Sequence, residues 1–365
     1  MAKKKNETKQ NIKMSALERE YVSNIILPVE TETRGKSFVS WGTNNKYPDY
    51  IDYLYENVST LQTLIDGTAD FCCGDKIESD VIKTNAKGHE VSDLVRFLAI
   101  DYLKYGGFAI NVIKDAFGNF KSAHYIDLKR LRSDKHNTKF FYSDSWDRWS
   151  TKMLEYPAYS HADTKQLNSI YFFKNTVNKV YSRPVWGAAT KACEIESLIT
   201  DFHLNNIHNG FSASYIINLI GNTPDDALKA EIEDMFLEKF SSNSNAGRFL
   251  LNFAMTKDDA ATVEKIDISD FDKQYDALSK RTQQEIFTAF RCNPNLFGIS
   301  TAQGFNSEEY EKSYELYKKA MVEPIQKRIT AAFDKITGIE GSVTITPFTI
   351  NFNGKKETIT KGKTV

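Results

Sequence analysis

The sequence has few cysteines and no long apolar run. Four of its 365 residues are cysteine, and they include no Cys-x-x-Cys pair. Neighbours such as Cys72 and Cys73 seldom bridge each other, because disulfide geometry is demanding. No apolar run approaches the ~18 residues that cross a bilayer, and the amino terminus, Met1-Ala2-Lys3-Lys4-Lys5, lacks the apolar core of a secretion signal. We therefore expect free thiols, no contact with a membrane, and a chain made and kept in the cytosol.

The sequence also lacks an excess of charge of either sign. It carries 47 Lys plus Arg against 48 Asp plus Glu, for a formal net charge of −1. This balance gives no global attraction to nucleic acid or to acidic membranes, so any electrostatic function must come from local segregation of charge. The length allows about two domains at roughly 150 residues each and is ample for a buried core.

The signatures of common catalytic sites are missing as well. Gly35-Lys36-Ser37 and Gly362-Lys363-Thr364 each have a glutamate where the leading glycine of a phosphate-binding loop belongs. His203 and His208 are five residues apart, off the same-face spacing of a helix, and no His-Glu-x-x-His motif or cysteine cluster accompanies them. There is no Gly-x-Ser-x-Gly motif. The sequence predicts no catalytic residue, no metal, no cofactor and no enzymatic activity.

The first half of the chain mixes helical and strand patterns. Residues 1–13 are rich in lysine and almost free of apolar side chains, which predicts a disordered basic tail; contact with nucleic acid is the alternative. Apolar residues at steps of three and four predict helices over Tyr50–Cys73 and Val91–Tyr105, the second ended by Gly106-Gly107. Alternation and turn residues predict strands over Phe108–Lys114, Lys121–Ile126, Ser169–Lys174 and Lys179–Tyr181. The class is therefore α+β.

The second half is dominated by long helices. One is expected over Val185–Asn209, and a second begins at Ser269 and ends before Pro294. Between them, Tyr215–Ile220, a helix from Thr223 to Phe240, and Arg248–Phe253 predict a small β-α-β insert. A further helix from Asn306 or Ser307 to Thr337 contains Pro324, which should kink it.

The order of these elements, with several local motifs, resembles the portal proteins of tailed bacteriophages, the HK97-like group. The motifs are the following segments: Tyr105-Gly106-Gly107-Phe108-Ala109 with its turn at Gly118, Pro184–Gly210, Glu285–Gly298, and Met321-Val322-Glu323-Pro324-Ile325. The resemblance covers most of the chain. It implies a portal-like α+β fold: an α/β wing, two long stem helices, a small β-α-β clip insert and a long kinked tunnel helix.

The resemblance also implies a function and a set of partners. The chain would form a cyclic oligomer, commonly of twelve copies, at one vertex of the capsid, in the virion and, during assembly, in the host cytoplasm. Double-stranded DNA would pass through the ring during packaging and ejection. The terminase large subunit, the major capsid protein and a head-tail adaptor would bind the ring.

Domain boundaries follow from the same resemblance. They are a disordered basic tail at 1–13, a wing at 14–183, stem helix 1 at 184–210, a clip at 211–268, stem helix 2 at 269–292, a tunnel loop and kinked helix returning to the wing at 293–338, and a C-terminal strand and polar tail at 339–365 with a minimal or absent crown.

Two candidate sites belong to this interpretation. The DNA-facing tunnel loop would be Ser300, Thr301, Ala302, Gln303, Gly304, Phe305 and Asn306, a small, polar, glycine-bearing segment; a plain interhelix loop is the alternative. The clip surface that meets the motor and adaptors would be Glu231, Asp234 and Glu238. Tyr310, Tyr314 and Tyr317 lie on one helical stripe, and we expect them to be buried between subunits.

Charge in the stem and clip gives a physical argument that is independent of the resemblance. From Pro184 to Pro294 there are 17 acidic residues against ten Lys plus Arg, a local charge of −7. An acidic bore repels phosphates and lets DNA slide, whereas a basic one would hold it. Ordinary surface acids on exposed helices explain the count equally well.

Two other functions stay open at this point. One is a head-completion or adaptor protein that docks on a ring made by another chain, which predicts a monomer. The other is a metal-dependent nuclease that uses scattered aspartates and histidines.

Overall fold

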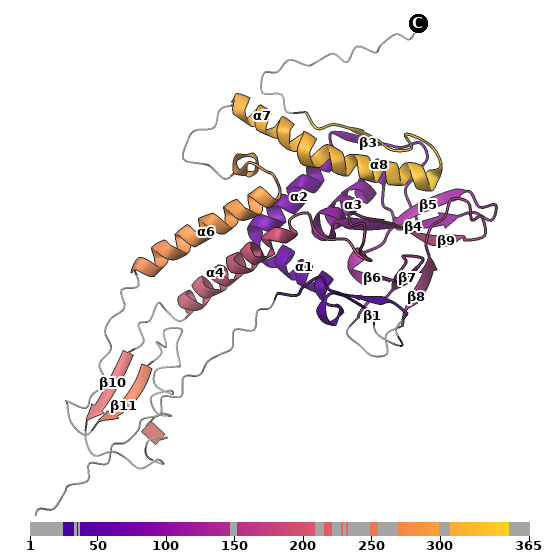
Figure 1. The fold of residues 1–365 in the computed structure, drawn as a ribbon. Helices are drawn as coiled ribbons and strands as arrows, with labels where there is room; N and C mark the ends of the chain where they lie inside the picture. The colour runs from indigo at the N-terminus through magenta and orange to yellow at the C-terminus, as the bar shows by residue number, and fades with distance from the viewer. Residues whose placement is uncertain are drawn as a thin grey trace, which may run out of the picture.

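The core of the molecule contains three consecutive helices and a three-stranded sheet, together with buried side chains of later helices (Figure 1). In the computed structural model, the described residues are 25–32, 35, 37–146, 152–208, 215–220, 228, 231–232, 249–254, 269–298 and 307–349. The helices of this core are α1 (Tyr47–Asn57), α2 (Ser59–Cys73) and α3 (Val91–Tyr105). Their apolar faces meet, and Leu54, Leu61 and Leu98 are at most 1% exposed.

The single helix predicted over Tyr50–Cys73 is wrong, because the structure divides it into α1 and α2. Val58 has an extended backbone, with φ −113° and ψ 101°, and separates the two helices. Its side chain is 1% exposed, and its N–H still donates to the carbonyl of Leu54 at 3.0 Å. No proline or glycine marks the bend, so tertiary burial of Val58 fixes it.

The end of α3 is confirmed, and glycine is the reason that it ends there. Gly106 has φ 78°, in the left-handed region, and its N–H donates to the carbonyl of Tyr102 at 2.7 Å. A Cβ at Gly106 would lie 1.8 Å from the carbonyl oxygen of Arg183. The chain therefore turns directly into the first strand of the central sheet.

The central sheet has β4 in its middle. β4 (Gly107–Lys114) pairs antiparallel with β5 (Phe120–Tyr125) and with β9 (Asn168–Lys174), which confirms the predicted hairpin and the strand over Ser169–Lys174. Short strands form other sheets, and the sequence analysis missed them except for the C-terminal strand expected within 339–365, where β12 lies. They are β1 (Glu30–Glu32) with β2 (Val39–Trp41), β6 (Leu131–Ser133) with β7 (Lys139–Tyr142) and β8 (Leu154–Pro157), and β3 (Lys76–Glu78) with β12 (Thr344–Thr346).

The strand predicted over Lys179–Tyr181 is wrong. Tyr181 instead anchors the segment through its side chain, because its ring stacks on Trp41 with centroids 4.5 Å apart and an interplanar angle of 3°. Its backbone N–H donates to the carboxylate of Glu30 at 2.9 Å rather than to a neighbouring strand.

Two long helices extend from the body side by side, as Figure 1 shows. They are α4 (Thr190–His208) and α6 (Ser269–Ala289). α4 begins later than the predicted Val185, because a 3₁₀ turn at Gly187–Ala189 precedes it. Beyond the far ends of these helices, β10 (Tyr215–Ile220) pairs in parallel with β11 (Phe249–Ala254), which confirms the two predicted strands of the insert. Most of the helix predicted between them lies outside the described residues.

The last helical region is continuous but not uniformly α-helical. α7 (Ser307–Tyr317) leads through a π-helical turn at Lys318–Val322 into α8 (Glu323–Thr337). The expected disturbance therefore takes the form of a π turn immediately before Pro324, where the N–H of Glu323 donates to the carbonyl of Lys318. Gly338 ends α8 with φ 74°, as predicted.

Candidate functional site

The base of α4 is fixed to the body by two buried glutamates. The hydroxyl of Tyr50 donates to Glu194 at 2.6 Å, and the hydroxyl of Thr60 donates to Glu196 at the same distance. Both glutamates are 7% exposed, and burial raises the pKa of the Glu196 carboxyl. These bonds join α4 to α1 and α2, so the direction of the two-helix stem is set by the core of the body.

Further along, the same helix exposes apolar side chains. Leu198 is 39% exposed and Phe202 is 38% exposed; being four residues apart, they lie on one face of α4. Leu204 on α4 and Leu278 on α6 are also exposed, by 51% and 37%. Phe202 also contacts Tyr275 of α6, with ring centroids 4.5 Å apart, and this contact joins the two helices. The stem thus presents apolar surface that the described residues leave partly exposed.

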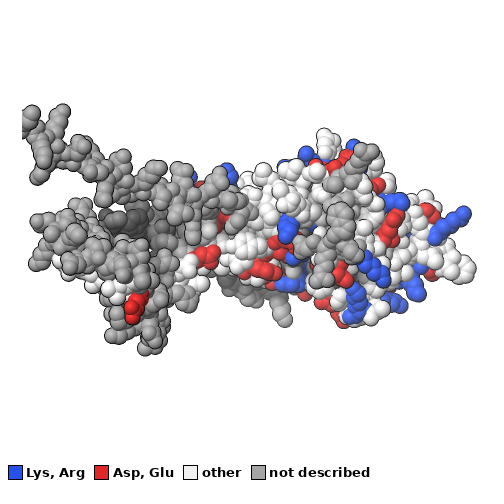
Figure 2. Space-filling view, turned by 90° about the horizontal axis from the view of Figure 1, so that it is seen from below, with Lys and Arg blue, Asp and Glu red and all other residues white. Residues whose placement is uncertain are grey.

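The stem carries less free acidic charge than its sequence indicates. Glu194 and Glu196 are among the acids counted between Pro184 and Pro294, but both face the body. On α6, Asp276 pairs with Lys280 at 2.7 Å, and Glu285 pairs with Arg281 at 3.1 Å. In the view of Figure 2, acidic and basic side chains are interspersed over the body. Both ion pairs are already cancelled within the net charge of −7, so only the two buried glutamates lower the acidic charge that could face a bore.

The segment after α6 is held rigidly up to Gly298. The side chain of Asn293 caps the 3₁₀ turn Pro294–Phe297 by accepting from the N–H of Asn295 at 3.1 Å, and Gly298 has φ 81°. Phe297 packs against Gly67 of α2 so closely that a Cβ at Gly67 would lie 2.3 Å from the ring. This anchored turn is the point from which the predicted tunnel loop departs.

The loop residues themselves, Ser300, Thr301, Ala302, Gln303, Gly304, Phe305 and Asn306, lie outside the described residues. Of the clip residues, Glu231 is described and is exposed in a helical conformation, whereas Asp234 and Glu238 lie outside. Whether these two sets face DNA and the motor therefore stays a prediction.

The tyrosine stripe on α7 is a correction. Tyr314 and Tyr317 are 2% and 1% exposed within this single chain, so their burial needs no second subunit. The hydroxyl of Tyr314 donates to the carbonyl of Phe348 at 3.0 Å, and that of Tyr317 is 2.5 Å from the hydroxyl of Thr68. Tyr310 donates to the carbonyl of Leu296 at 3.3 Å. The stripe fastens α7 to the body.

Perturbed titratable groups in the body have structural explanations. Burial alone would raise the pKa of the Asp52 carboxyl, but Lys104, Lys129 and Tyr105 hold it below its ordinary value. This cluster joins α1, α3 and the 3₁₀ turn Leu128–Arg130.

Over the part of the chain that the structure describes, there is no group of three or more His, Cys, Asp or Glu residues that could hold a metal ion. Within the same part, no helix is both long enough and apolar enough to cross a membrane.

Comparison with known proteins was made at the level of sequence and of fold. The family model described as phage portal protein matches residues 80–353, about three quarters of the chain. No curated protein matches the sequence.

Solved structures resemble the fold at low sequence identity. A chain in the virion of a native gene transfer agent particle is 14% identical, with a TM-score of 0.52, and the match covers 82% of this chain and 83% of that one. A chain in the neck of a native gene transfer agent particle, computed with C12 symmetry, is 15% identical, with a TM-score of 0.50 and coverage of 81% and 82%. An HK97 family phage portal protein from Corynebacterium diphtheriae is 13% identical, with a TM-score of 0.48 and coverage of 81% and 94%.

Proposed function

This chain belongs to the phage portal protein family, and from that premise we propose that copies of it assemble into a closed ring. The ring most simply contains twelve copies, and duplex DNA passes through it. The fold is α+β and portal-like, and the role as a conduit for DNA follows from the family. Portal proteins are structural components of virions, so we propose that the chain acts at a capsid vertex and performs no bond-breaking chemistry.

The main observation in support of ring formation is the apolar surface of the stem. Leu198 and Phe202 lie on one face of a helix whose base is fixed by Glu194 and Glu196, and both stay more than a third exposed although Phe202 also contacts Tyr275 of α6. A rigid stem with apolar side chains exposed on one face is suited to packing against the stem of a neighbouring copy. Such a contact is heterologous, because it joins different surfaces of two copies. It closes into a ring when the rotation that relates neighbouring copies is a whole-number fraction of a full turn. The twelvefold symmetry applied to the similar neck structure supports twelve as the number of copies.

The proposal assigns a role to each region of the chain. Residues 14–183 form the wing that meets the major capsid protein, α4 and α6 form the stem, and the region 211–268 with β10 and β11 forms the clip. The clip, including Glu231, Asp234 and Glu238, binds the terminase large subunit during packaging and head-tail adaptors afterwards. The loop Ser300–Asn306, which follows the turn at Pro294–Phe297 in the sequence, contacts the DNA. During assembly the chain is in the host cytoplasm.

Native mass spectrometry of the purified full-length chain, at micromolar concentration and over a range of salt, tests this proposal. The proposal expects closed rings with one dominant stoichiometry; thirteen copies would change the number but keep the ring. A monomer at every salt concentration would contradict it. A monomer that joins a preformed ring of another protein would instead identify an adaptor, and Mg²⁺- or Mn²⁺-dependent cleavage of DNA, abolished by one carboxylate substitution, would identify a nuclease.

A further inference from the structure

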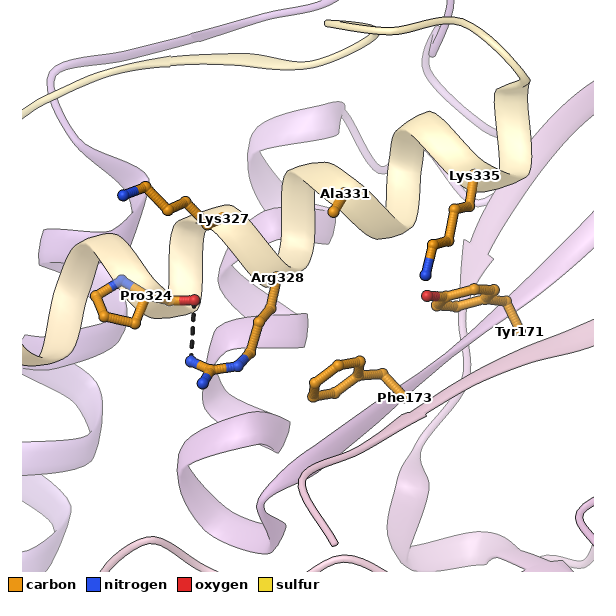
Figure 3. Close-up of a pocket in the computed structure, with 7 residues that line it drawn as sticks. All are labelled: Tyr171, Phe173, Pro324, Lys327, Arg328, Ala331 and Lys335. Carbon is orange, nitrogen blue, oxygen red and sulfur yellow. Dashed lines mark hydrogen bonds between the residues drawn. The ribbon is translucent and has the colours of Figure 1, made fainter. Parts of the chain in front are cut away.

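A hollow between α8 and β9 combines an apolar lining with three cationic side chains (Figure 3). Its volume is about 380 Å³. β9 is at the edge of the central sheet, and α8 lies across it. Ligand pockets span about 300–1,000 Å³, so this hollow has room for one or two side chains of a partner but not for a folded element.

The apolar lining is rigid. Tyr171 and Phe173 are two residues apart on β9 and therefore face the same side of the sheet. Phe173 stacks on Phe108 of β4, with centroids 5.1 Å apart and an interplanar angle of 15°. Pro324 and Ala331 of α8 complete the lining. Because these groups are held by the sheet and by a helix, the hollow exists before any ligand arrives.

The cations are incompletely paired. Arg328 holds its guanidinium 5.4 Å from the ring of Tyr102 and donates one N–H to the carbonyl of Pro324 at 3.0 Å. A guanidinium has five N–H donors, and within the described residues this is the one hydrogen bond of the Arg328 side chain. Lys327 is 3.9 Å from Glu323 with its side chain 79% exposed, and Lys335 is exposed with its amine near the hydroxyl end of Tyr171. The site therefore presents positive charge beside an apolar hollow.

This combination selects one class of ligand. A phosphate of duplex DNA is hydrophilic and convex, so it would leave the rings of Tyr171 and Phe173 unfilled. A purely apolar partner would leave Arg328 and Lys335 without counter-charges, whereas Lys327 already lies near Glu323. A peptide that carries a large apolar side chain between carboxylates satisfies both halves of the site.

We propose that this pocket, lined by Tyr171 and Phe173 from β9 and by Lys327, Arg328 and Lys335 from α8, binds an acidic segment of a partner protein that inserts one aromatic side chain. The aromatic ring lies on Phe173 and Pro324. Neighbouring carboxylates accept hydrogen bonds from Arg328 and form ion pairs with the two lysines. The inference concerns the body of the chain and does not depend on ring formation.

Fluorescence anisotropy with the full-length protein tests it. The probe is a labelled peptide Glu-Glu-Phe-Glu-Glu, compared with the same peptide carrying Ser in place of Phe and with Lys-Lys-Phe-Lys-Lys. We expect the first peptide to bind at least tenfold more tightly than either of the others. Equal binding of the Phe and Ser peptides would show that charge alone attracts them and would overturn the proposal.

Three variants locate the binding site. Ala331 is exposed, so Ala331→Trp fills the hollow with little effect on folding, and Lys335→Glu reverses one charge. Arg328→Met removes the hydrogen-bond donors but keeps an apolar stem. Each should weaken binding of Glu-Glu-Phe-Glu-Glu at least tenfold. The control is Lys319→Glu, which makes the same charge change at an exposed position in the π turn and should leave affinity within twofold.

Unchanged affinity in Ala331→Trp and Lys335→Glu would overturn the assignment, even if Arg328→Met failed to fold. Displacement of the peptide by a short DNA duplex at lower concentration than by unlabelled peptide would also contradict it, because the site would then prefer phosphate. Binding to monomer but not to assembled rings would identify the pocket as a contact between copies of this chain and would overturn it as well.

Discussion

Replacing the apolar face of the stem should prevent ring assembly without unfolding the subunit. The variant is Leu198→Ser with Phe202→Ser, which changes two side chains four residues apart on α4. In the single chain they are 39% and 38% exposed. Complete burial of a leucine or phenylalanine contributes about 1.5–3 kcal/mol. Burial of the surface that the two side chains still expose would together contribute about 2 kcal/mol to each contact between copies. Loss of this contribution raises the dissociation constant of each contact about 30-fold.

The assay is native mass spectrometry over a dilution series, with circular dichroism to confirm the fold. The wild-type chain should remain assembled at concentrations where the variant has dissociated. Phe202 also contacts Tyr275, so a modest decrease in the unfolding midpoint is expected in the variant. The matched control is Phe117→Ser with Val177→Ser, which removes one aromatic and one aliphatic side chain that are 85% and 90% exposed on the body. Assembly of the stem variant at wild-type concentrations, or equal loss of assembly in the control, would refute the reasoning.

Three further predictions concern the loop, the clip and the core. Deletion of Thr301–Phe305 should leave rings intact but lower the amount of DNA protected from nuclease in packaging reactions; failure to form rings would show that the segment is structural instead. Glu231→Lys with Asp234→Lys and Glu238→Lys should reduce capture of the terminase large subunit on immobilised rings, and unchanged capture would remove this helix from the interface. Asp52→Asn should lower the free energy of unfolding by about 1.5–3 kcal/mol near neutral pH, because Lys104 and Lys129 lose a partly buried, hydrogen-bonded counter-charge. Since the fold lowers the pKa of Asp52, its stabilisation is present above the unfolded-state pKa of about 3.9 and is lost as pH falls through the lower folded-state value. Urea unfolding should therefore show the difference between wild type and variant shrinking in acid; an equal difference at every pH would contradict this.

The parts of the fold that sequence reasoning predicted well are those with local causes. α3 was placed correctly because its apolar spacing is regular and Gly106 supplies the left-handed residue that ends it. The hairpin of β4 and β5 was found because a turn with Gly118 separates two alternating runs. Both signals lie within a few residues of the structure that they specify.

The parts that were missed depend on contacts that are remote in sequence. Val58 separates α1 from α2 through burial, and the pairing of β3 with β12 joins residues at least 266 positions apart in the sequence. Tyr181 resembles part of a strand in sequence but is fixed by stacking on Trp41. No local pattern encodes such contacts.

The candidate site shows the same division. The stem helices were predicted from periodicity, but the acidic count in their sequence could not reveal that Glu194 and Glu196 face the body. A stripe of tyrosines on α7 indicates that the rings are buried, but it does not indicate whether they pack on the same chain or on a neighbouring subunit. The pocket between α8 and β9 was not anticipated, since Phe173 and Arg328 meet only in the folded chain.

Electron microscopy of the purified full-length chain tests the central claim most directly. End-on views should show closed rings with a central opening that admits duplex DNA. Particles that lack an opening, or fields of isolated monomers at concentrations where assembly is expected, would contradict the account.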